Sequence, residues 1–346
     1  MTPPGTPGES RSETLYSEAL LQKRITVREM AGARGRGLSS GTRLKAILFP
    51  LLHWSFRHSP RWLALLPIQL PVALLRLLYG WKSNPLRRGC EAVSRIAAAH
   101  GHRHPPRQLY RRFLDNVTGV MKDYFQLYRH GVEAVSSHIE LADDDARLIR
   151  DLAGTHGGVV LAVPHNIASA IAALRLNRSF PLVVVARNSP TIARTRIALD
   201  FFERMEVPVL MVRGGNPFEL SRTLFSILRE GRVIAATLDN IDNSSRRVAV
   251  EMFGQDIGLA PWAAKIAARM QLPVVPCWFR SDGRRIAIVM GEPLQSDDAT
   301  ALVQHYADFF ERNILADPAS WAYLVDKHWC RLLEQAADAW GTPDHQ

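Results

Sequence analysis

The sequence has few cysteines and lacks the spacing by which cysteines form disulfides or zinc sites. Cys90, Cys277 and Cys330 stand far apart, and no two of them form a C-x-x-C pair. Small disulfide-stabilised domains and zinc ribbons need paired cysteines, so the sequence argues against both classes. A reducing cytoplasmic compartment is the simplest location for such a chain.

The sequence also lacks a cleavable signal peptide and an uninterrupted apolar stretch of the roughly 20 residues that a membrane-spanning helix needs. Residues 1–12 are mostly proline, glycine, serine, threonine and charge, and residues 31–41 are rich in glycine, arginine and serine. Such compositions bury too little apolar surface to fold. We therefore predict a flexible basic tail over residues 1–43.

Motifs of several enzyme and binding classes are missing too. No Walker loop is present, and no G-x-S-x-G sequence accompanies a strand-to-helix turn, which argues against a serine hydrolase. His100, His102 and His104 have a spacing that fits no common metal site, so we expect no metal. The net charge of +10 favours a polyanionic partner. Without a nucleic-acid recognition motif, that partner is expected to be anionic lipid or an acidic carrier protein, and not nucleic acid.

Two apolar runs occupy residues 44–56 and 63–79. Prolines and histidines interrupt them, and tryptophan and arginine residues stand at their borders. Aromatic and cationic borders are typical of helices that lie in a membrane interface and are attracted to an anionic surface. We predict a membrane-associating helical region over residues 44–106; the alternative is a pair of helices packed on a soluble core.

The remaining residues, 107–346, are predicted to form one α/β domain. An amphipathic helix is indicated over residues 107–129, and after residue 157 short β-branched runs alternate with helical ones. This alternation predicts a layered, largely parallel sheet flanked by helices. The expected strands are 159–163, 182–185, 207–212, 233–238, 248–252, 274–279 and 286–290; the expected helices are 168–176, 191–205, 218–230, 263–270 and 300–313.

One histidine directly follows a buried strand. The run 159–163 ends in Pro164, His165 and Asn166, and a helix follows. In open α/β sheets the ligand crevice lies at the carboxyl ends of the strands. The positive end of the following helix disfavours the imidazolium, which suits a general base. We interpret His165 as the candidate catalytic base; the alternative is a histidine that only caps the helix.

Polar residues follow three other predicted strands. Asp239 and Asn240 follow the fourth strand, where a carboxylate can orient the imidazole or bind an acceptor head group. Arg187 and Asn188 follow the second strand and Arg213 follows the third, so they offer donors for a phosphate or a thioester oxyanion. For Asp239, a plain turn aspartate is the alternative.

Short motifs also follow one another in a defined order between residues 109 and 329. They are Tyr110-Arg111-Arg112-Phe113 with Asn116, Pro164-His165, Ala186-Arg187-Asn188 with Arg204, Leu228-Arg229-Glu230-Gly231, Leu238-Asp239-Asn240, Phe253-Gly254 with Pro261, Leu272-Pro273-Val274-Val275-Pro276, and Asp317-Pro318-Ala319-Ser320-Trp321 with Trp329. This ordered set resembles the lipid A biosynthesis lauroyl/myristoyl acyltransferase family, a branch of the lysophospholipid acyltransferase superfamily.

The resemblance implies an acyltransferase with a glycerolipid acyltransferase-like fold. Such an enzyme moves a fatty acyl group from a thioester to a hydroxyl of a membrane glycolipid or phospholipid. The thioester of acyl carrier protein or of coenzyme A would be the co-substrate, with no further cofactor. The resemblance also implies peripheral or monotopic attachment at the cytoplasmic face of a bacterial inner membrane.

The sequence departs from the family pattern at one position. In the family, an Asp or Glu five residues after the histidine orients it, and here this position is Ala170. We expect Asp239 to supply the missing carboxylate, with Asn166 and Ser169 as candidates for fixing the ring tautomer or binding substrate. The alternative is a catalytically silent relative that binds acyl lipid or a partner without turnover.

Overall fold

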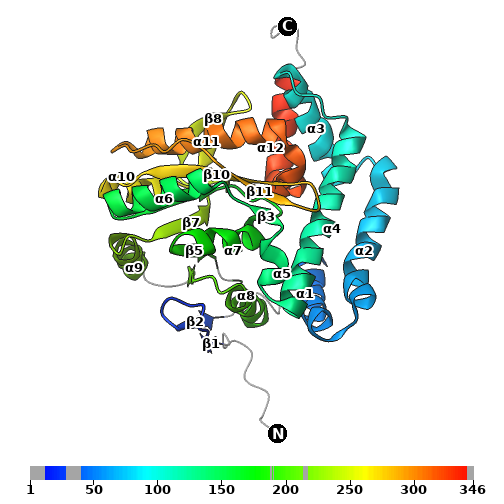
Figure 1. Ribbon diagram of the computed structural model, residues 1–346. Coiled ribbons are helices and arrows are strands. Elements are labelled where there is room, and N and C mark those ends of the chain that lie inside the picture. Colours follow the sequence, from blue (N-terminus) through cyan, green and yellow to red (C-terminus); the bar gives the residue numbers. More distant parts are fainter. Residues whose placement is uncertain (1–11, 29–39, 188, 190, 213–216, 341–346) are drawn as a thin grey trace, which may run out of the picture.

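A seven-stranded sheet forms the centre of the protein (Figure 1). The computed structural model describes residues 12–28, 40–187, 189, 191–212 and 217–340. The strands are β3 (Ile139–Glu140), β4 (Val159–Val163), β5 (Leu182–Ala186), β6 (Val209–Met211), β7 (Val233–Thr237), β10 (Val274–Ser281) and β11 (Ile286–Met290). Their order is β3-β11-β10-β4-β7-β5-β6; all neighbours from β10 to β6 are parallel, whereas β11 runs antiparallel to β10. The expected largely parallel sheet is confirmed.

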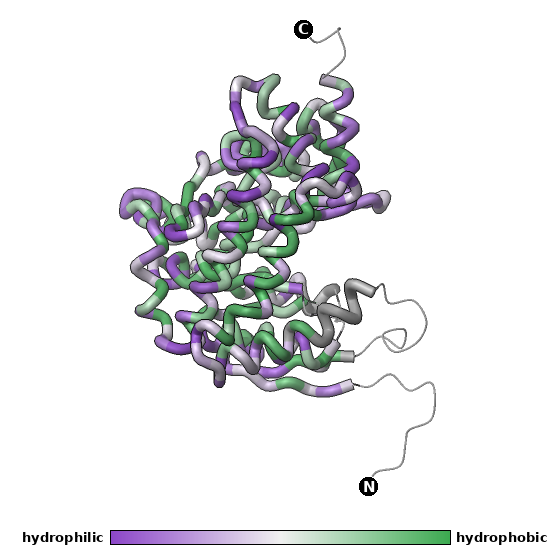
Figure 2. Tube along the Cα trace, turned by 90° about the vertical axis from the view of Figure 1, so that its right-hand side faces the viewer, coloured by the Kyte–Doolittle hydropathy of each residue, from purple (hydrophilic) through white to green (hydrophobic). Residues whose placement is uncertain are grey.

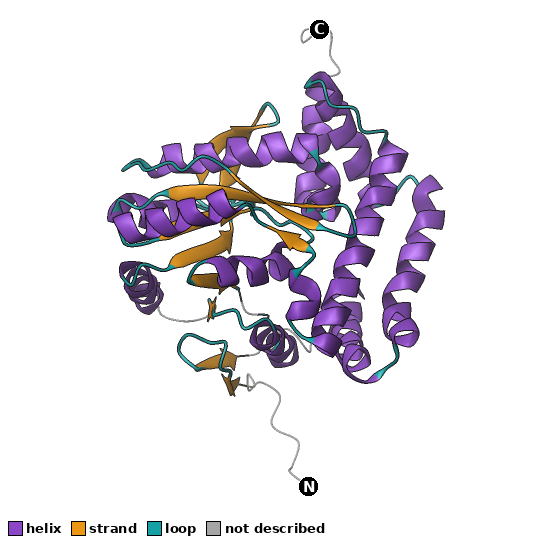
Figure 3. Ribbon diagram, in the orientation of Figure 1, coloured by secondary structure: helices purple, strands orange, loops and turns teal. Residues whose placement is uncertain are grey.

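Helices cover both faces of this sheet (Figure 3). Successive side chains of a strand point to opposite faces, so Val160 and Ala162 of β4 join one apolar cluster while Val159, Leu161 and Val163 join the other. Because both of its faces are apolar, β4 is buried in the interior of the sheet. The face of Val159 is covered by α6 (Asp143–His156), α7 (Ser169–Ser179) and α8 (Ile192–Arg204), and the face of Val160 by α9 (Pro217–Arg229), α10 (Trp262–Met270), α11 (Ala299–Ala316) and α12 (Lys327–Trp340).

The sheet divides at the carboxyl ends of its central strands. β5 pairs with β7 only along the first three residues of each strand. Beyond that point Val185 and Ala186 pair with β6, while Ala236 and Thr237 pair with β4. The separating strands open a crevice at the edge of the sheet where ligands bind in parallel folds.

The region expected to associate with a membrane is helical. One face of α2, including Leu65 and Val72, packs into the same core cluster as α4, as the soluble alternative predicts. The helix nevertheless continues through Pro67 and Pro71. By length and composition the stretch Arg61–Gly80 is apolar enough to cross a membrane, and 22% of its most apolar 18-residue window is buried. The helices of this region are α1 (Ser40–His58), α2 (Arg61–Leu77), η2 (Leu78–Gly80) and α3 (Pro85–Ala99), followed by α4 (Pro106–His130) and α5 (Glu133–Ser136).

Residues 12–28 form a β-hairpin where the sequence predicts part of a flexible tail. Strands β1 (Ser12–Tyr16) and β2 (Arg24–Arg28) pair in antiparallel fashion and bury Leu15 and Val27. Backbone groups of the hairpin turn pair with Val209 of β6, the last strand of the sheet. The hairpin therefore covers the edge of the sheet, where unpaired backbone N–H and C=O groups could pair with another chain. This stabilising contact joins distant parts of the sequence, so the composition of residues 1–43 does not predict it. The rest of the predicted tail, up to residue 39, lies outside the described residues.

Most other expected elements of the α/β domain are present within three residues of their expected bounds. A hairpin formed by β8 (Val248–Met252) and β9 (Gln255–Leu259) has a second strand that the sequence pattern does not predict. Its two-residue turn, Phe253-Gly254, has positive φ at both positions, as tight hairpin turns require. Two short 3-10 helices, η3 (Pro318–Ser320) and η4 (Ala322–Val325), lead into α12.

Candidate active site

The register of two neighbouring strands brings His165 and Asp239 together. Val163 of β4 pairs with Thr237 of β7, and each of the two site residues lies two positions beyond that pair. Oδ1 of Asp239 lies 2.5 Å from Nδ1 of His165. A carboxylate beside Nδ1 selects the tautomer that is protonated on Nδ1 and leaves the lone pair on Nε2.

Several donors hold the Asp239 carboxylate in place. Its side chain is 1% exposed, whereas that of His165 is 29% exposed. Oδ2 accepts hydrogen bonds from the backbone N–H of His165 and from the indole N–H of Trp321, both at 2.9 Å. The indole N–H of Trp329 donates to the Asp239 backbone carbonyl at 3.0 Å. Buried carboxylates are stabilised by such donors, so the acid beside His165 has a rigid position.

The electrostatic surroundings of His165 differ from those inferred from the helix that follows it. α7 begins only at Ser169, whereas the Asp239 carboxylate directly contacts the ring. An adjacent opposite charge favours the imidazolium, while a helix N-terminus disfavours it. The nearer group is the carboxylate, so the site is built to stabilise His165 after it has accepted a proton.

Tyr323 covers one face of the imidazole. The two rings stack with centroids 4.2 Å apart and an angle of 20° between their planes. The tyrosine oxygen lies 3.1 Å from Nε2 of His165, and its hydroxyl donates to Oδ1 of Asn240 at 2.8 Å. Burial, and then the charges of Asp239 and Asp326, raise the pKa of Tyr323 above its ordinary value, so this hydroxyl remains protonated at neutral pH.

The segment at 317–325 carries both Trp321 and Tyr323, and side chains from other elements anchor it. Arg112 of α4 forms an ion pair with Asp317 at 3.0 Å, and the side chain of Asn116 donates to the Ala319 carbonyl at 3.0 Å. The backbone N–H of Ala322 donates to the His165 carbonyl at 2.7 Å. These contacts hold the two aromatic residues against the base and its acid.

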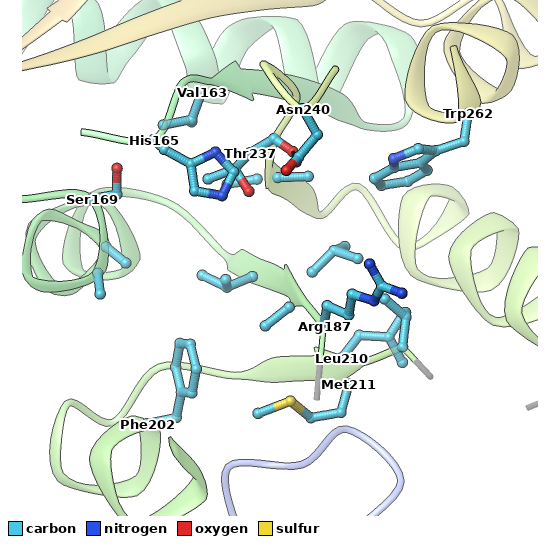
Figure 4. A pocket seen from close by; sticks show the side chains of 18 of the residues that line it. Val163, His165, Ser169, Arg187, Phe202, Leu210, Met211, Thr237, Asn240 and Trp262 are labelled. Carbon is cyan, nitrogen blue, oxygen red and sulfur yellow. Dashed lines mark hydrogen bonds between the residues drawn. The ribbon is translucent and has the colours of Figure 1, made fainter. Parts of the chain in front are cut away.

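A cavity of about 930 Å³ opens beside His165, at the point where β5 and β7 separate (Figure 4). Much of its wall is apolar and includes Leu176 of α7, Phe202 of α8 and Met211 of β6. Thr237, Asn240 and Trp262 lie on the same side of the cavity as His165, and Arg187 lies on the other side of it. An apolar cavity with a few polar groups at one side is typical of a small-molecule site. This cavity suits a ligand that has an apolar body and one polar end.

The remaining predicted site residues divide into two groups. Ser169, Arg187 and Asn240 line the cavity. Arg187 is exposed there, with no ion pair within the described part of the chain. Asn166 is 5% exposed and does not line it, because its amide donates to the Ser320 carbonyl and accepts from the Phe279 backbone N–H. Its contacts support a positioning role rather than the expected substrate contact.

Ser169 also contributes to the local structure. Its hydroxyl donates to the Pro164 carbonyl at 3.2 Å and accepts from the Asn166 backbone N–H at 3.0 Å. These bonds shape the turn between β4 and α7 and do not reach the imidazole ring. The predicted binding residues Asn188 and Arg213 lie outside the described residues.

Ala170 lines the cavity near the start of α7. The family's usual carboxylate position is therefore part of the apolar wall, and the acid contacts the ring from the segment that follows β7 instead. Trp321, Trp329 and Tyr323 received no role from the sequence. The only signal for the two tryptophans was their place in the ordered motifs, and nothing singled out Tyr323.

No group of three or more His, Cys, Asp or Glu side chains arranged to hold a metal ion occurs among the described residues. The histidines at 100 and 104 instead contact backbone carbonyls, with Nδ1 of His100 at 2.9 Å from Ile96 and Nε2 of His104 at 2.8 Å from Leu315. These contacts use one ring nitrogen of each histidine for local structure.

Comparison with known families identifies the family of the chain. The family model described as bacterial lipid A biosynthesis acyltransferase matches residues 96–329, which include His165, Asp239 and the segment that carries Tyr323. No curated protein matches the chain. The matched region begins within α3 and ends within α12, so it spans the whole sheet.

Proposed function

The chain belongs to the bacterial lipid A biosynthesis acyltransferase family, and from this premise we propose that it transfers a fatty acyl group from a thioester to a hydroxyl of a membrane lipid. The observation that carries the proposal is the 2.5 Å contact between Asp239 and His165 beside an apolar cavity. This contact supplies a base paired with an acid even though Ala170 replaces the family's usual carboxylate.

The chemistry proceeds through a tetrahedral intermediate. Nε2 of His165 accepts the proton of the lipid hydroxyl while the hydroxyl oxygen attacks the thioester carbonyl. Asp239 stabilises the imidazolium that forms. The intermediate then collapses: the carbon–sulfur bond breaks, and the imidazolium returns its proton to the departing sulfur. The products are the acylated lipid and a free thiol, and His165 is again neutral.

The acyl chain is proposed to occupy the apolar cavity. Leu176, Phe202 and Met211 are among its apolar lining residues, and its volume of about 930 Å³ lies within the roughly 300–1,000 Å³ typical of ligand pockets. Arg187, exposed across the cavity from His165, is suited to a phosphate of either substrate or to the oxyanion. The carbonyl carbon would then lie near His165, with the hydrocarbon directed away from water.

A basic groove next to the cavity supports a carrier protein as the acyl donor. The groove, about 1,000 Å³ in volume, runs between α9 and α10, and Trp262 lines both it and the cavity. Its exposed cations form no ion pair within the described part of the chain, and apolar side chains lie between them. Charges spread along two helices fit an extended acidic protein surface better than one compact phosphate cluster. The cations are Arg222, Arg229, Lys265 and Arg269.

The helical region before α3 is proposed to bring the enzyme to the membrane that holds the acceptor. Trp62, Leu70, Leu74 and Leu77 are between 55% and 82% exposed. Figure 2 turns this side of the protein toward the viewer and shows hydrophobic segments along it. Exposed apolar area of this extent marks an interaction surface, and the Trp and Arg residues at its ends suit the membrane interface.

Mass spectrometry of lipids tests the proposal. Cells with the intact gene are compared with cells whose only copy encodes His165→Ala, at equal protein levels. The variant cells should accumulate a lipid that lacks one acyl chain, and purified wild-type protein should add that chain from an acyl thioester. Identical lipids in both strains, together with acyl lipid that copurifies equally with both proteins, would favour the silent binding relative.

A further inference from the structure

Tyr323 contacts the one imidazole nitrogen that Asp239 leaves free. Its ring stacks on the His165 ring at 4.2 Å between centroids, and its oxygen lies 3.1 Å from Nε2. Because the ring planes are within 20° of parallel, this oxygen lies over the imidazole face and not along the in-plane lone pair of Nε2. An acceptor hydroxyl can therefore approach Nε2 in the plane of the ring while Tyr323 stays in place.

The hydrogen-bond pattern of Tyr323 favours a protonated His165. A phenol carries a single hydrogen, and that hydrogen is directed to Oδ1 of Asn240 at 2.8 Å. The oxygen then presents only lone pairs to Nε2. While Nε2 is itself unprotonated, this contact adds little stabilisation. Once His165 is protonated, the tyrosine oxygen presents its lone pairs to the face of the cationic ring, and the phenol ring attracts that cation.

We propose that Tyr323 is a positioning residue that holds the His165 imidazole in the orientation that contacts Asp239 and stabilises the imidazolium formed when His165 accepts the acceptor's proton. The inference depends on the proposed function only for the source of that proton. The charged and titratable groups around the ring are Asp239 after β7, Tyr323 in η4 and Arg187 across the cavity; Asp326 acts on Tyr323, and Tyr306 is influenced by Asp239.

Two substitutions separate the contributions of the phenol. Tyr323→Phe keeps the stacked ring and removes the oxygen, whereas Tyr323→Leu keeps apolar cover over the imidazole and removes both. Val325→Ala is the matched control, because Val325 lies in the same short helix and is 48% exposed. All three proteins should melt at temperatures close to that of the wild type, since none of these changes opens a buried core site.

The first measurement is an NMR titration of the His165 ring in the purified protein, with His165→Asn used to assign its signals. Removing a group that stabilises the imidazolium makes proton loss easier, so the titration midpoint should fall by about 0.5–1 pH unit in Tyr323→Leu and by less in Tyr323→Phe. It should not move in Val325→Ala. This readout needs no substrate and is independent of the acyl transfer reaction.

The second measurement is acyl transfer as a function of pH. In Tyr323→Leu, kcat should fall about tenfold with KM changed less than about twofold, and the acid limb of kcat/KM should move to lower pH. An unmoved or raised titration midpoint in Tyr323→Leu would overturn the inference, and so would a higher kcat in Tyr323→Phe, which would show that the hydroxyl obstructs Nε2. A lowered midpoint in a protein that transfers no acyl group would retain the inference and reject the proposed function.

Discussion

The Asp239 carboxylate holds His165 by both its ring and its backbone. Oδ1 lies 2.5 Å from Nδ1 of the ring, and Oδ2 accepts the His165 backbone N–H at 2.9 Å. Two-point contact removes the freedom of the carboxylate to turn away from the imidazole. The position of the family's usual acid, Ala170, lies on α7, whereas the acid of this chain follows the neighbouring strand β7.

The paired roles of these two residues predict a non-additive mutational cycle. Asp239→Asn should lower kcat by about two to four orders of magnitude, since loss of the equivalent carboxylate in a serine protease costs about 10⁴. His165→Ala should abolish transfer, and Asp239→Asn should add nothing in that background. The measurement is acyl transfer by purified variants whose folding is checked by circular dichroism. Equal turnover of Asp239→Asn and wild type would reject the pair as the catalytic unit.

A carboxylate restored at the family's position should not help this enzyme. Ala170 lines the apolar cavity, and Nδ1 of His165 is already occupied by Asp239. Ala170→Asp should therefore lower acyl transfer by about tenfold or more, because an unpaired charge would enter the apolar wall. Ala170→Ser, a small neutral change, serves as the control. A gain in turnover by Ala170→Asp would show that residue 170 can still act on the histidine.

The exposed face of α2 should bind membranes. Leu70→Glu and Leu74→Glu place charges on that face without touching the buried residues of the helix. In a flotation assay the double variant should no longer rise with anionic vesicles, while its active site stays intact toward short soluble thioesters. Leu148→Glu, at a 38% exposed leucine of α6, controls for a new surface charge. Equal flotation of all three proteins would remove α2 from the attachment site.

The basic groove should discriminate between donors. Reversal of Arg222 and Lys265 to Glu should raise KM for an acyl carrier protein thioester by about tenfold and weaken its dependence on salt, because rim charges act mainly on association. KM for an acyl-coenzyme A should change much less. A variant with Arg312 and Arg331 changed to Glu has the same net charge and exposed sites elsewhere. An equal loss in both double variants would mean that only overall charge matters.

The half-buried carboxylate of Asp123, outside the site, should affect stability in a defined pH window. Burial raises the pKa of Asp123 to about 6, although His138, 3.8 Å away, lowers it in part. The ordinary value of about 3.9 applies to the unfolded chain, so between about pH 4 and 6 the folded protein binds more protons than the unfolded one. The stabilisation from this group is complete below pH 4 and is lost as pH rises through 6.

Asp123→Asn should therefore match the wild type in unfolding free energy near pH 4. Above pH 6 it should be more stable, by about 1–3 kcal/mol, because an amide carries no charge to desolvate. Urea unfolding at several pH values measures the difference. A variant less stable than the wild type at pH 7 would show that the contact with His138 outweighs the cost of burial.

Local sequence patterns determined much of the fold and two residues of the site. Alternating β-rich and helical runs predicted the parallel sheet, because the spacing of apolar residues within each run depends on which of its own side chains are buried. His165 and Asp239 stood out because a polar residue directly after a buried apolar strand must lie at the sheet's edge. The family resemblance, carried by short motifs in order, came from the same local information.

Only the tertiary structure decided which of these residues meet. Strand neighbours and register follow from pairing between distant segments: β7 lies beside β4 although β5 and β6 intervene in the chain. Tyr323 and Trp321 reach His165 and Asp239 from an irregular segment with no periodicity to read. The buried amide of Asn166 and the hairpin next to β6 likewise depend on partners far along the chain. Such long-range contacts cannot be predicted from a local sequence pattern, because the pattern contains only neighbouring residues.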